Sequence, residues 1–329
     1  LRSRLKGMKI YSPWSTASPP LLVDQWRPVK ADDEDPHLIL FEAIPEEFKK
    51  IGIGFVRMIG TDDLLAMHLI QELYRRNIDV RPTPSGKGDH VVLISEWDTF
   101  YGKAFPLTFA TMMEAIRINP GNRWGLDWIA YSGRIHHRRL SEGHQEFPDN
   151  LCTYTYIAGI DGRLPGSESI EETVSEADIQ SRSKWAYSKV LELPIGRGQL
   201  DYARRLSQKL SQKYGGISGP KLKAIGVVGS DVYDKLILLH ALREQFGNIT
   251  LFTTDLDARL LHHEQFKWIR NVIVASNYGL RLNEAYQRGV YQDDESGLAP
   301  FRDNYQTALF FACRTALGLP IDKSKGMFR

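Results

Sequence analysis

One repeated unit strongly limits how this chain can fold: an apolar strand that ends in small or acidic residues and continues directly into a helix. It occurs as FVRMIGTDDLLAMHLIQELYRR (55–76), HVVLISEWDTFYGKAFPLTFATMM (90–113) and AIGVVGSDVYDKLILLHALREQF (224–246). A weaker copy, ITLFTTDLDARLL (249–261), keeps the strand and shortens the helix. Strands that alternate with helices form a mainly parallel sheet, because each helix returns the chain to the start of the next strand. The predicted fold class is therefore α/β, with helices on both faces of the sheet.

Other segments extend the pattern. Amphipathic helices are predicted at 201–214 and 304–318. The helix of the second unit is expected to start only after Gly102 and Pro106, since both residue types disfavour a helix interior. Apolar runs also predict further strands, at 37–44, 126–135, 151–162 and 271–276.

Composition excludes some classes of protein. A hydrophobic content of 42% and a charged content of 25% are typical of a soluble globular protein, and 329 residues suffice for two domains. The 42 basic and 40 acidic residues nearly cancel, so no overall field favours nucleic acid. No apolar run approaches the ~18 residues that a membrane span requires. Cys152 and Cys313 lie in apolar contexts and are predicted to be free and buried, although a disulfide stays open.

The strand–helix junctions hold the candidate binding residues. In a parallel sheet with helical crossovers, the carboxyl ends of the strands meet at one edge, where ligands bind. Every junction here is polar and acidic, which favours an amino-containing ligand over a purely anionic one. Helix capping by the same residues is the alternative for several of them. The candidate ligand-binding residues are Thr61, Asp62, Ser95, Glu96, Asp98, Tyr101, Ser230, Asp231, Tyr233, Thr254, Asp255 and Ser276.

A different chemistry is left open at Asp255 and Asp257. This DxD pattern could coordinate Mg²⁺ or Mn²⁺ in a nucleotide-sugar transferase or a hydrolase, because hard cations bind clustered carboxylate oxygens. The pairs His136-His137 and His262-His263 are adjacent rather than four residues apart, which disfavours zinc. No dinucleotide turn, Walker loop or nucleophile elbow is present. No cofactor and no catalytic residue are therefore predicted.

Three segments resemble one family. EWDTFYGKAFPLTF (96–109), AIGVVGSDVYDKLILLHALREQFGNITLFTTD (224–255) and NYQTALFFACRTALG (304–318) are similar to type 1 periplasmic binding proteins, the branched-chain amino acid receptor group and related receptor ligand-binding regions. The resemblance implies two lobes that hold a small polar molecule in a cleft between them. It therefore implies a non-enzymatic sensor or solute-binding domain, in an extracytoplasmic setting. A ligand-less interaction scaffold is a further alternative.

The same resemblance divides the chain. Residues 1–37 are expected to form an irregular arm, 38–89 with 299–329 the first lobe, and 90–298 the second lobe with an atypical insertion at about 120–198. The few strand–helix units in the first lobe leave open that it is reduced. The chain begins with Leu, which suits a mature form or a fragment of a larger or membrane-anchored parent. A homodimer stays open as well.

Overall fold

The computed structural model describes residues 5–18, 21, 46–82, 88–118, 132, 135, 147–160, 200–215, 221–283, 286 and 298–319. The strand predicted at 37–44 lies outside these residues, as does most of 120–198. Of the strand predicted at 126–135, only Ser132 and Ile135 are described, and both are helical, which contradicts the prediction at those positions. The hydroxyls of Ser132 and Thr111 share a hydrogen bond at 2.9 Å, in which either can be the donor.

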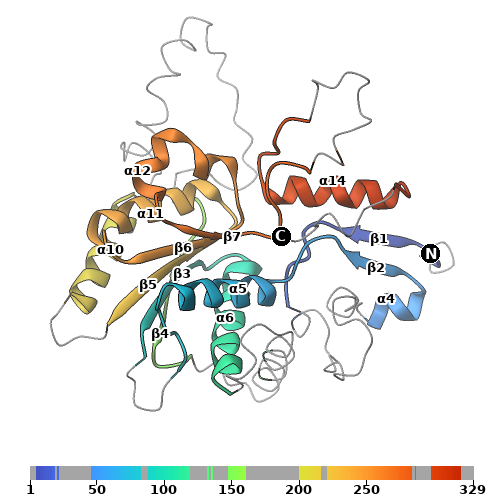
Figure 1. The fold of residues 1–329 in the computed structure, drawn as a ribbon. Coiled ribbons are helices and arrows are strands. Elements are labelled where there is room, and N and C mark those ends of the chain that lie inside the picture. Colours follow the sequence, from blue (N-terminus) through green and yellow to red (C-terminus); the bar gives the residue numbers. More distant parts are fainter. Residues whose placement is uncertain are drawn as a thin grey trace, which may run out of the picture.

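A five-stranded parallel sheet is the centre of the molecule (Figure 1), and it confirms the α/β class. Its strands are β3 (His90–Glu96), β4 (Leu151–Tyr156), β5 (Leu222–Val228), β6 (Thr250–Thr254) and β7 (Ile273–Ala275). Their order across the sheet is β4-β3-β5-β6-β7. The central strands β3 and β5 are almost entirely buried, as the continuous apolar runs in their sequences predict for strands covered on both faces.

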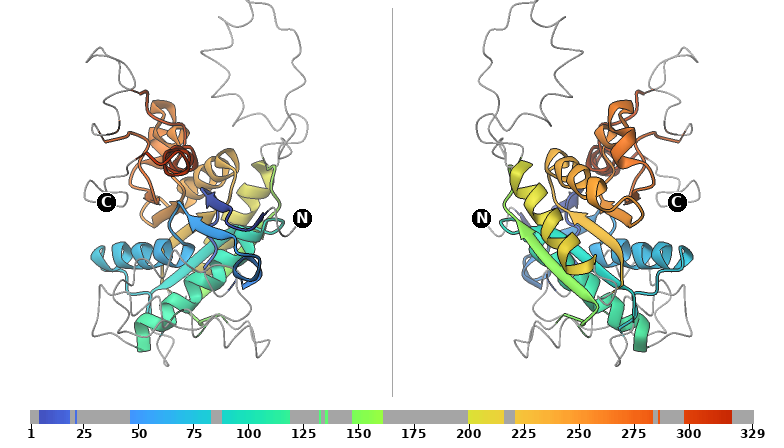
Figure 2. Two further views of the ribbon diagram at one scale, coloured as in Figure 1. Left: turned by 90° about the vertical axis from the view of Figure 1, so that its right-hand side faces the viewer. Right: turned by 90° about the vertical axis from the view of Figure 1, so that its left-hand side faces the viewer.

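Helices cover both faces of this sheet (Figure 2). Helices α5 (Asp62–Arg75) and α6 (Phe100–Ile118) pack on one face, where Val91 and Leu93 of β3 contact them. The alternate residues of β3 belong to the other cluster, with α10 (Leu200–Tyr214) and α11 (Val232–Gln245). The predicted amphipathic helix at 201–214 is thus confirmed.

A smaller unit lies beside the large sheet. It consists of a parallel pair, β1 (Lys9–Ser12) and β2 (Gly54–Arg57), with α4 (Glu46–Ile51) before β2 and α14 (Asn304–Ala316) packed against it. In Figure 1 this unit is on the right. A division of the chain at residue 89 would separate α5 from α6 and from the cluster in which it packs, since α5 follows β2 but belongs to the larger core.

The two units are joined through the start of α14. Here Asp257 and Asp303 form an antiparallel bridge, Ala258 N–H donates to the Arg302 carbonyl at 2.7 Å, and Asn304 N–H donates to the Leu256 carbonyl at 3.0 Å. The turn that follows β6 therefore fixes the position of α14 next to the carboxyl edge of the large sheet.

The predicted start of α6 is wrong. The helix begins at Phe100 and contains both Gly102 and Pro106. Gly102 is needed inside it because an added Cβ would collide with the Glu96 carbonyl, and its N–H donates to the Thr99 hydroxyl at 3.0 Å. This local crowding outweighs the low helix propensity of Gly102.

Both cysteines are free, but only Cys152 is partly buried; Cys313 is exposed, which contradicts its predicted burial. Cys313 lies on α14, whose buried face is formed instead by residues such as Phe311 and Ala312. Among the described residues, no helix is long and apolar enough to cross a membrane.

Gly226 in β5 offers a test of the core. A Cβ at this position would collide with the Phe252 ring and lie 2.7 Å from Leu93 Cδ2. We expect Gly226→Ala to lower the free energy of unfolding by about 1–3 kcal/mol, because the added methyl group overpacks the core. Urea denaturation measures this loss. Gly247→Ala is the control, since a Cβ there meets no atom within 4 Å. An equal loss in both variants would contradict the packing described.

Candidate functional site

The predicted binding residues separate into two groups at the carboxyl edge of the large sheet. One group surrounds Glu96 and the start of α11. The other surrounds Asp62 and Asp255, where the large sheet meets the smaller unit. They differ in whether their carboxylate oxygens already have donors, and this difference decides which group is free to bind a ligand.

Glu96, the last residue of β3, is fully buried and accepts hydrogen bonds from several donors. One of its oxygens accepts the backbone N–H groups of Ser230 at 2.7 Å and Asp231 at 3.2 Å. The hydroxyls of Ser230, Thr99 and Tyr156 donate as well, at 2.9, 2.9 and 3.4 Å for the closest contact of each. A helix N-terminus favours a negative group. Here Glu96 supplies that group from within the protein.

This network requires glycine at position 229. A Cβ on Gly229 would collide with the Tyr156 hydroxyl and lie 2.7 Å from a Glu96 oxygen. The nearby Glu96 charge and burial together raise the pKa of Tyr156, burial contributing more, so that this phenol stays a hydrogen-bond donor. We therefore assign Glu96 and Ser230 a structural role.

The remaining members of this group are also engaged. Asp231 caps α11 by accepting the Tyr233 N–H at 2.7 Å, and the Tyr233 ring lies beneath the Arg259 guanidinium at 4.8 Å. The exposed Asp98 accepts the Ala158 N–H at 3.0 Å, and Ser95 is buried within β3. Capping, the alternative weighed for these residues, thus accounts for Asp231.

Ser276, beyond β7, lies closer to the second group. Its hydroxyl accepts the Leu256 N–H at 3.3 Å and donates to the Tyr278 carbonyl at 2.8 Å. Both its donor and an acceptor site are used, so Ser276 holds the turn after β6 in place.

The second group is built on Asp62 and Asp255, which are 1% and 6% exposed. Asp62 is the first residue of α5, and its N–H donates to the Thr16 carbonyl at 2.7 Å. Asp255 follows β6 with a φ of 62°, a left-handed conformation that aspartate tolerates better than most residues. One oxygen of each carboxylate, Asp62 Oδ1 and Asp255 Oδ2, is buried and has no donor among the described residues.

The two carboxylates are close enough to interact. Burial raises the pKa of Asp62 to about 8, and the charge of Asp255 is the second cause of the rise. A hydrogen bond from the Thr16 side chain acts in the opposite direction. At neutral pH, Asp62 therefore retains a proton. None of the described residues donates a hydrogen bond to its Oδ1.

Tyrosine and threonine side chains complete this surface. Tyr101 donates to the Thr254 hydroxyl at 2.6 Å, and burial, followed by the charges of Asp255 and Asp62, raises the pKa of both Tyr101 and Tyr305. Thr61 occupies the N-cap position of α5, but its side chain makes no capping hydrogen bond. The structure thus brings together Thr61, Asp62, Tyr101, Thr254 and Asp255.

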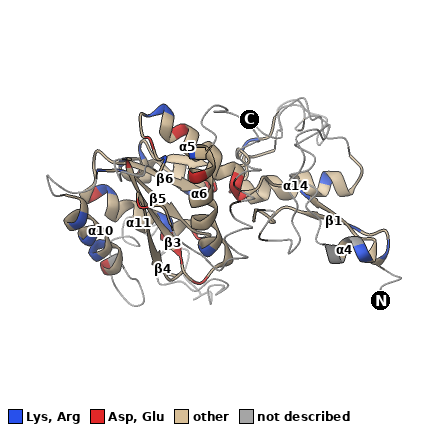
Figure 3. Ribbon diagram, turned by 90° about the horizontal axis from the view of Figure 1, so that it is seen from below, with Lys and Arg blue, Asp and Glu red and all other residues tan. Residues whose placement is uncertain are grey.

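Sequence reasoning missed Asn304 and Tyr305 at the start of α14. Asn304 is fully buried, donates from Nδ2 to Asp255 at 3.0 Å, and leaves its own Oδ1 without a donor. The signal was a polar Asp-Asn-Tyr run directly before an apolar helix, at 303–305. Figure 3 shows acidic residues, in red, at the end of α14 that faces the large sheet.

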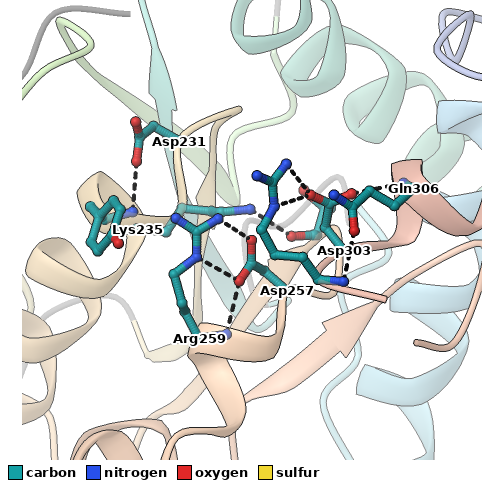
Figure 4. Close-up of polar contacts among 9 residues, drawn as sticks. Asp231, Lys235, Asp257, Arg259, Asp303 and Gln306 are labelled. Atoms are coloured by element: carbon teal, nitrogen blue, oxygen red, sulfur yellow. Dashed lines mark hydrogen bonds and ion pairs between the residues drawn. The ribbon is translucent and has the colours of Figure 1, made fainter. Parts of the chain in front are cut away.

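The DxD pattern does not form a pair of converging carboxylates. Both oxygens of Asp257 accept from the Arg259 guanidinium, at 2.9 and 2.8 Å, and Figure 4 shows this pair beside Asp303 and Gln306. Asp257 also accepts the Arg259 N–H at 2.8 Å, which begins a short 3-10 helix. In the described parts of the chain, no three His, Cys, Asp or Glu side chains are placed to hold a metal ion.

Lys235 balances part of the acidic charge. It is 2% exposed and donates from Nζ to the Thr254 carbonyl at 3.0 Å. Burial lowers its pKa, and the charges of Asp255 and Asp257 oppose this shift. A buried lysine thus lies among these acidic side chains.

Comparison with known proteins gives no match: no protein-family model, no curated protein and no solved structure is similar to this chain. The resemblance to periplasmic binding proteins stays a prediction, and the geometry of the site is the basis for the functional proposal.

Proposed function

We propose that this chain is a small-molecule binding domain that holds a protonated amine between Asp62 and Asp255, and that Asp62 releases its proton to solvent when the ammonium binds. In this proposal the large sheet is one lobe, and β1, β2 and α14 form a reduced second lobe. The ligand lies between them, where the carboxyl edge of the sheet meets the start of α14.

The observation that carries the proposal is the set of buried acceptors without donors. Asp62 Oδ1, Asp255 Oδ2 and Asn304 Oδ1 are all buried and all lack a hydrogen-bond donor among the described residues. Buried polar atoms are nearly always paired, and leaving one unpaired costs about 1–3 kcal/mol. A group that carries several N–H donors and a positive charge satisfies all three, which matches an ammonium better than an anion.

Glu96 supports the same choice of site. The start of α11 is the place where a carboxylate or phosphate ligand would be expected, but Glu96 already occupies it. The proposed ligand therefore binds at the Asp62–Asp255 group through its amine.

Calorimetry and thermal unfolding with simple amines test this proposal. Methylammonium and ethanolammonium should raise the melting temperature of the protein, because a ligand that binds the native state stabilises it. Tetramethylammonium, which has the charge but no N–H donor, should not. We expect Asp255→Asn to weaken ethanolammonium binding at least tenfold.

Asp98→Asn is the matched control, since Asp98 is exposed and does not belong to the Asp62–Asp255 group. It should bind ethanolammonium as the unmodified protein does. Equal affinities for Asp255→Asn and Asp98→Asn, or an equal response to tetramethylammonium, would reject the proposed site.

A further inference from the structure

Arg57, the last residue of β2, is a buried arginine with most of its donors unused. It is 2% exposed, and its Nη1 donates to the Ala17 carbonyl at 2.6 Å. Nε and Nη2 are buried and have no acceptor among the described residues. Arginine is almost never fully buried without a partner, because removing its charge from water is costly.

The two free groups form the edge that best fits a carboxylate. Nε and Nη2 lie on the same side of the planar guanidinium and can bind two oxygens at once. Other described arginines hold an aspartate through that edge, Arg302 among them. Arg259 holds Asp257 through Nε at 2.9 Å and Nη2 at 2.8 Å, and Arg81 holds Asp79 through the same two nitrogens.

A third unpaired donor belongs to the segment that contacts Arg57. Ser18 is 2% exposed, its hydroxyl is buried and has no partner, and it directly follows Ala17, whose carbonyl holds Arg57 Nη1. A hydroxyl group donates readily to a carboxylate oxygen. Arg57 and Ser18 are therefore two unpaired donor residues attached to the same short segment.

We infer that the Nε/Nη2 edge of Arg57 and the Ser18 hydroxyl form a buried subsite for a carboxylate. The guanidinium would hold two oxygens side by side, and Ser18 would donate to one of them. This inference goes beyond the proposed function, since it stands whether or not an amine binds at Asp62 and Asp255.

The charges around Arg57 leave its positive charge uncompensated. Asp63 and Asp62 are the acidic groups that act on it, yet no described carboxylate lies within ion-pair distance of it. Burial raises the pKa of both aspartates, to about 8 for Asp62. Neither aspartate accepts a hydrogen bond from Nε or Nη2 of Arg57, so that edge is left for an external carboxylate. The alternative is a small movement that brings the Asp63 carboxylate onto the Nε/Nη2 edge of Arg57, so that no external carboxylate can bind there.

Isothermal calorimetry with sodium acetate tests the subsite, with sodium chloride at equal ionic strength as reference. We expect acetate to bind the unmodified protein and chloride not to compete. Arg57→Lys keeps the positive charge but cannot donate two parallel hydrogen bonds to a carboxylate. It should therefore weaken acetate binding at least tenfold. Ser18→Ala, which retains Arg57, should weaken it about threefold to tenfold, equivalent to the loss of one hydrogen bond.

Arg81→Lys is the control, because Arg81 presents the same edge but Asp79 already occupies it. It should bind acetate normally. No acetate binding to the unmodified protein would overturn the inference and favour closure by Asp63. Equal affinity in Arg57→Lys and Arg81→Lys would overturn it too, and so would tighter binding of sulfate than of acetate. Because acetate carries no amine, failure here leaves the ethanolammonium experiment unaffected.

Discussion

Glu96→Ala is expected to lower the free energy of unfolding by about 3–5 kcal/mol, the largest effect of any single substitution described here. The carboxylate is fully buried, and its removal would leave the N–H groups of Ser230 and Asp231 and several hydroxyls without an acceptor. It would also remove the negative group at the start of α11. Glu96→Gln, which keeps the shape and one acceptor oxygen, should lose less, about 1–3 kcal/mol.

Urea denaturation followed by circular dichroism measures this loss. Asp98→Ala is the matched control, two residues away in sequence. Asp98 is exposed and accepts one described hydrogen bond, from Ala158, so its loss should cost about 1 kcal/mol or less. If Glu96→Ala proved no more damaging than Asp98→Ala, the assignment of Glu96 as the internal cap of α11 would be wrong.

The second large effect is a dependence of stability on pH that arises from Asp62. Its pKa is about 8 in the folded protein and about 3.9 in an unfolded chain. Between these values the folded state binds the proton and the unfolded state does not. The stabilisation is therefore complete below about pH 4 and is lost as pH rises to about 8, at up to about 1.4 kcal/mol per pH unit.

Asp62→Asn should remove this dependence. The variant should gain stability relative to the unmodified protein as pH rises from about 4 to about 8, because an amide does not ionise in the unfolded chain. Urea midpoints at pH 5, 7 and 9 measure the difference. A variant whose stability falls with pH as steeply as that of the unmodified protein would show that Asp62 is not the titrating group.

Asp79→Asn serves as the comparison, since the pKa of Asp79 is shifted in the opposite direction to that of Asp62. A hydrogen bond from Arg81 lowers the pKa of Asp79, so its stabilisation is present above the unfolded pKa and is lost as pH falls. Asp79 is 44% exposed, and solvent screening keeps this contribution well below 1 kcal/mol. The two variants should therefore differ in both the sign and the size of their pH response.

The sequence was sufficient to predict the parallel sheet because its signal is local and continuous. The runs VVLIS and AIGVV are apolar on both faces, and each is followed by a helix with its own apolar face. The same reasoning placed α10 and α14 correctly. It failed at the start of α6, where Gly102 is required by the turn that brings it against the Glu96 carbonyl, a backbone geometry that the residue types alone do not reveal.

The candidate site was predicted only in outline, for a related reason. Acidic residues at strand ends could be either helix caps or ligand-binding groups. The local sequence pattern is the same in both cases. Glu96 accepts its two backbone hydrogen bonds from residues more than a hundred positions away, whereas Asp62 and Asp255 retain unpaired oxygens. Arg57 ends the strand GFVR as an ordinary polar residue would, and only its burial distinguishes it.

The docking of α14 against β1 and the turn after β6 has a consequence for how the protein is made. Asn304 contributes to the Asp62–Asp255 site, so that site is incomplete until residues 304–316 have left the ribosome and packed. The large sheet can form earlier, since its five strands end at residue 275. Under the proposed function, ligand binding should therefore begin only after α14 has emerged and packed, and a chain stalled before α14 would be folded in its centre but unable to bind.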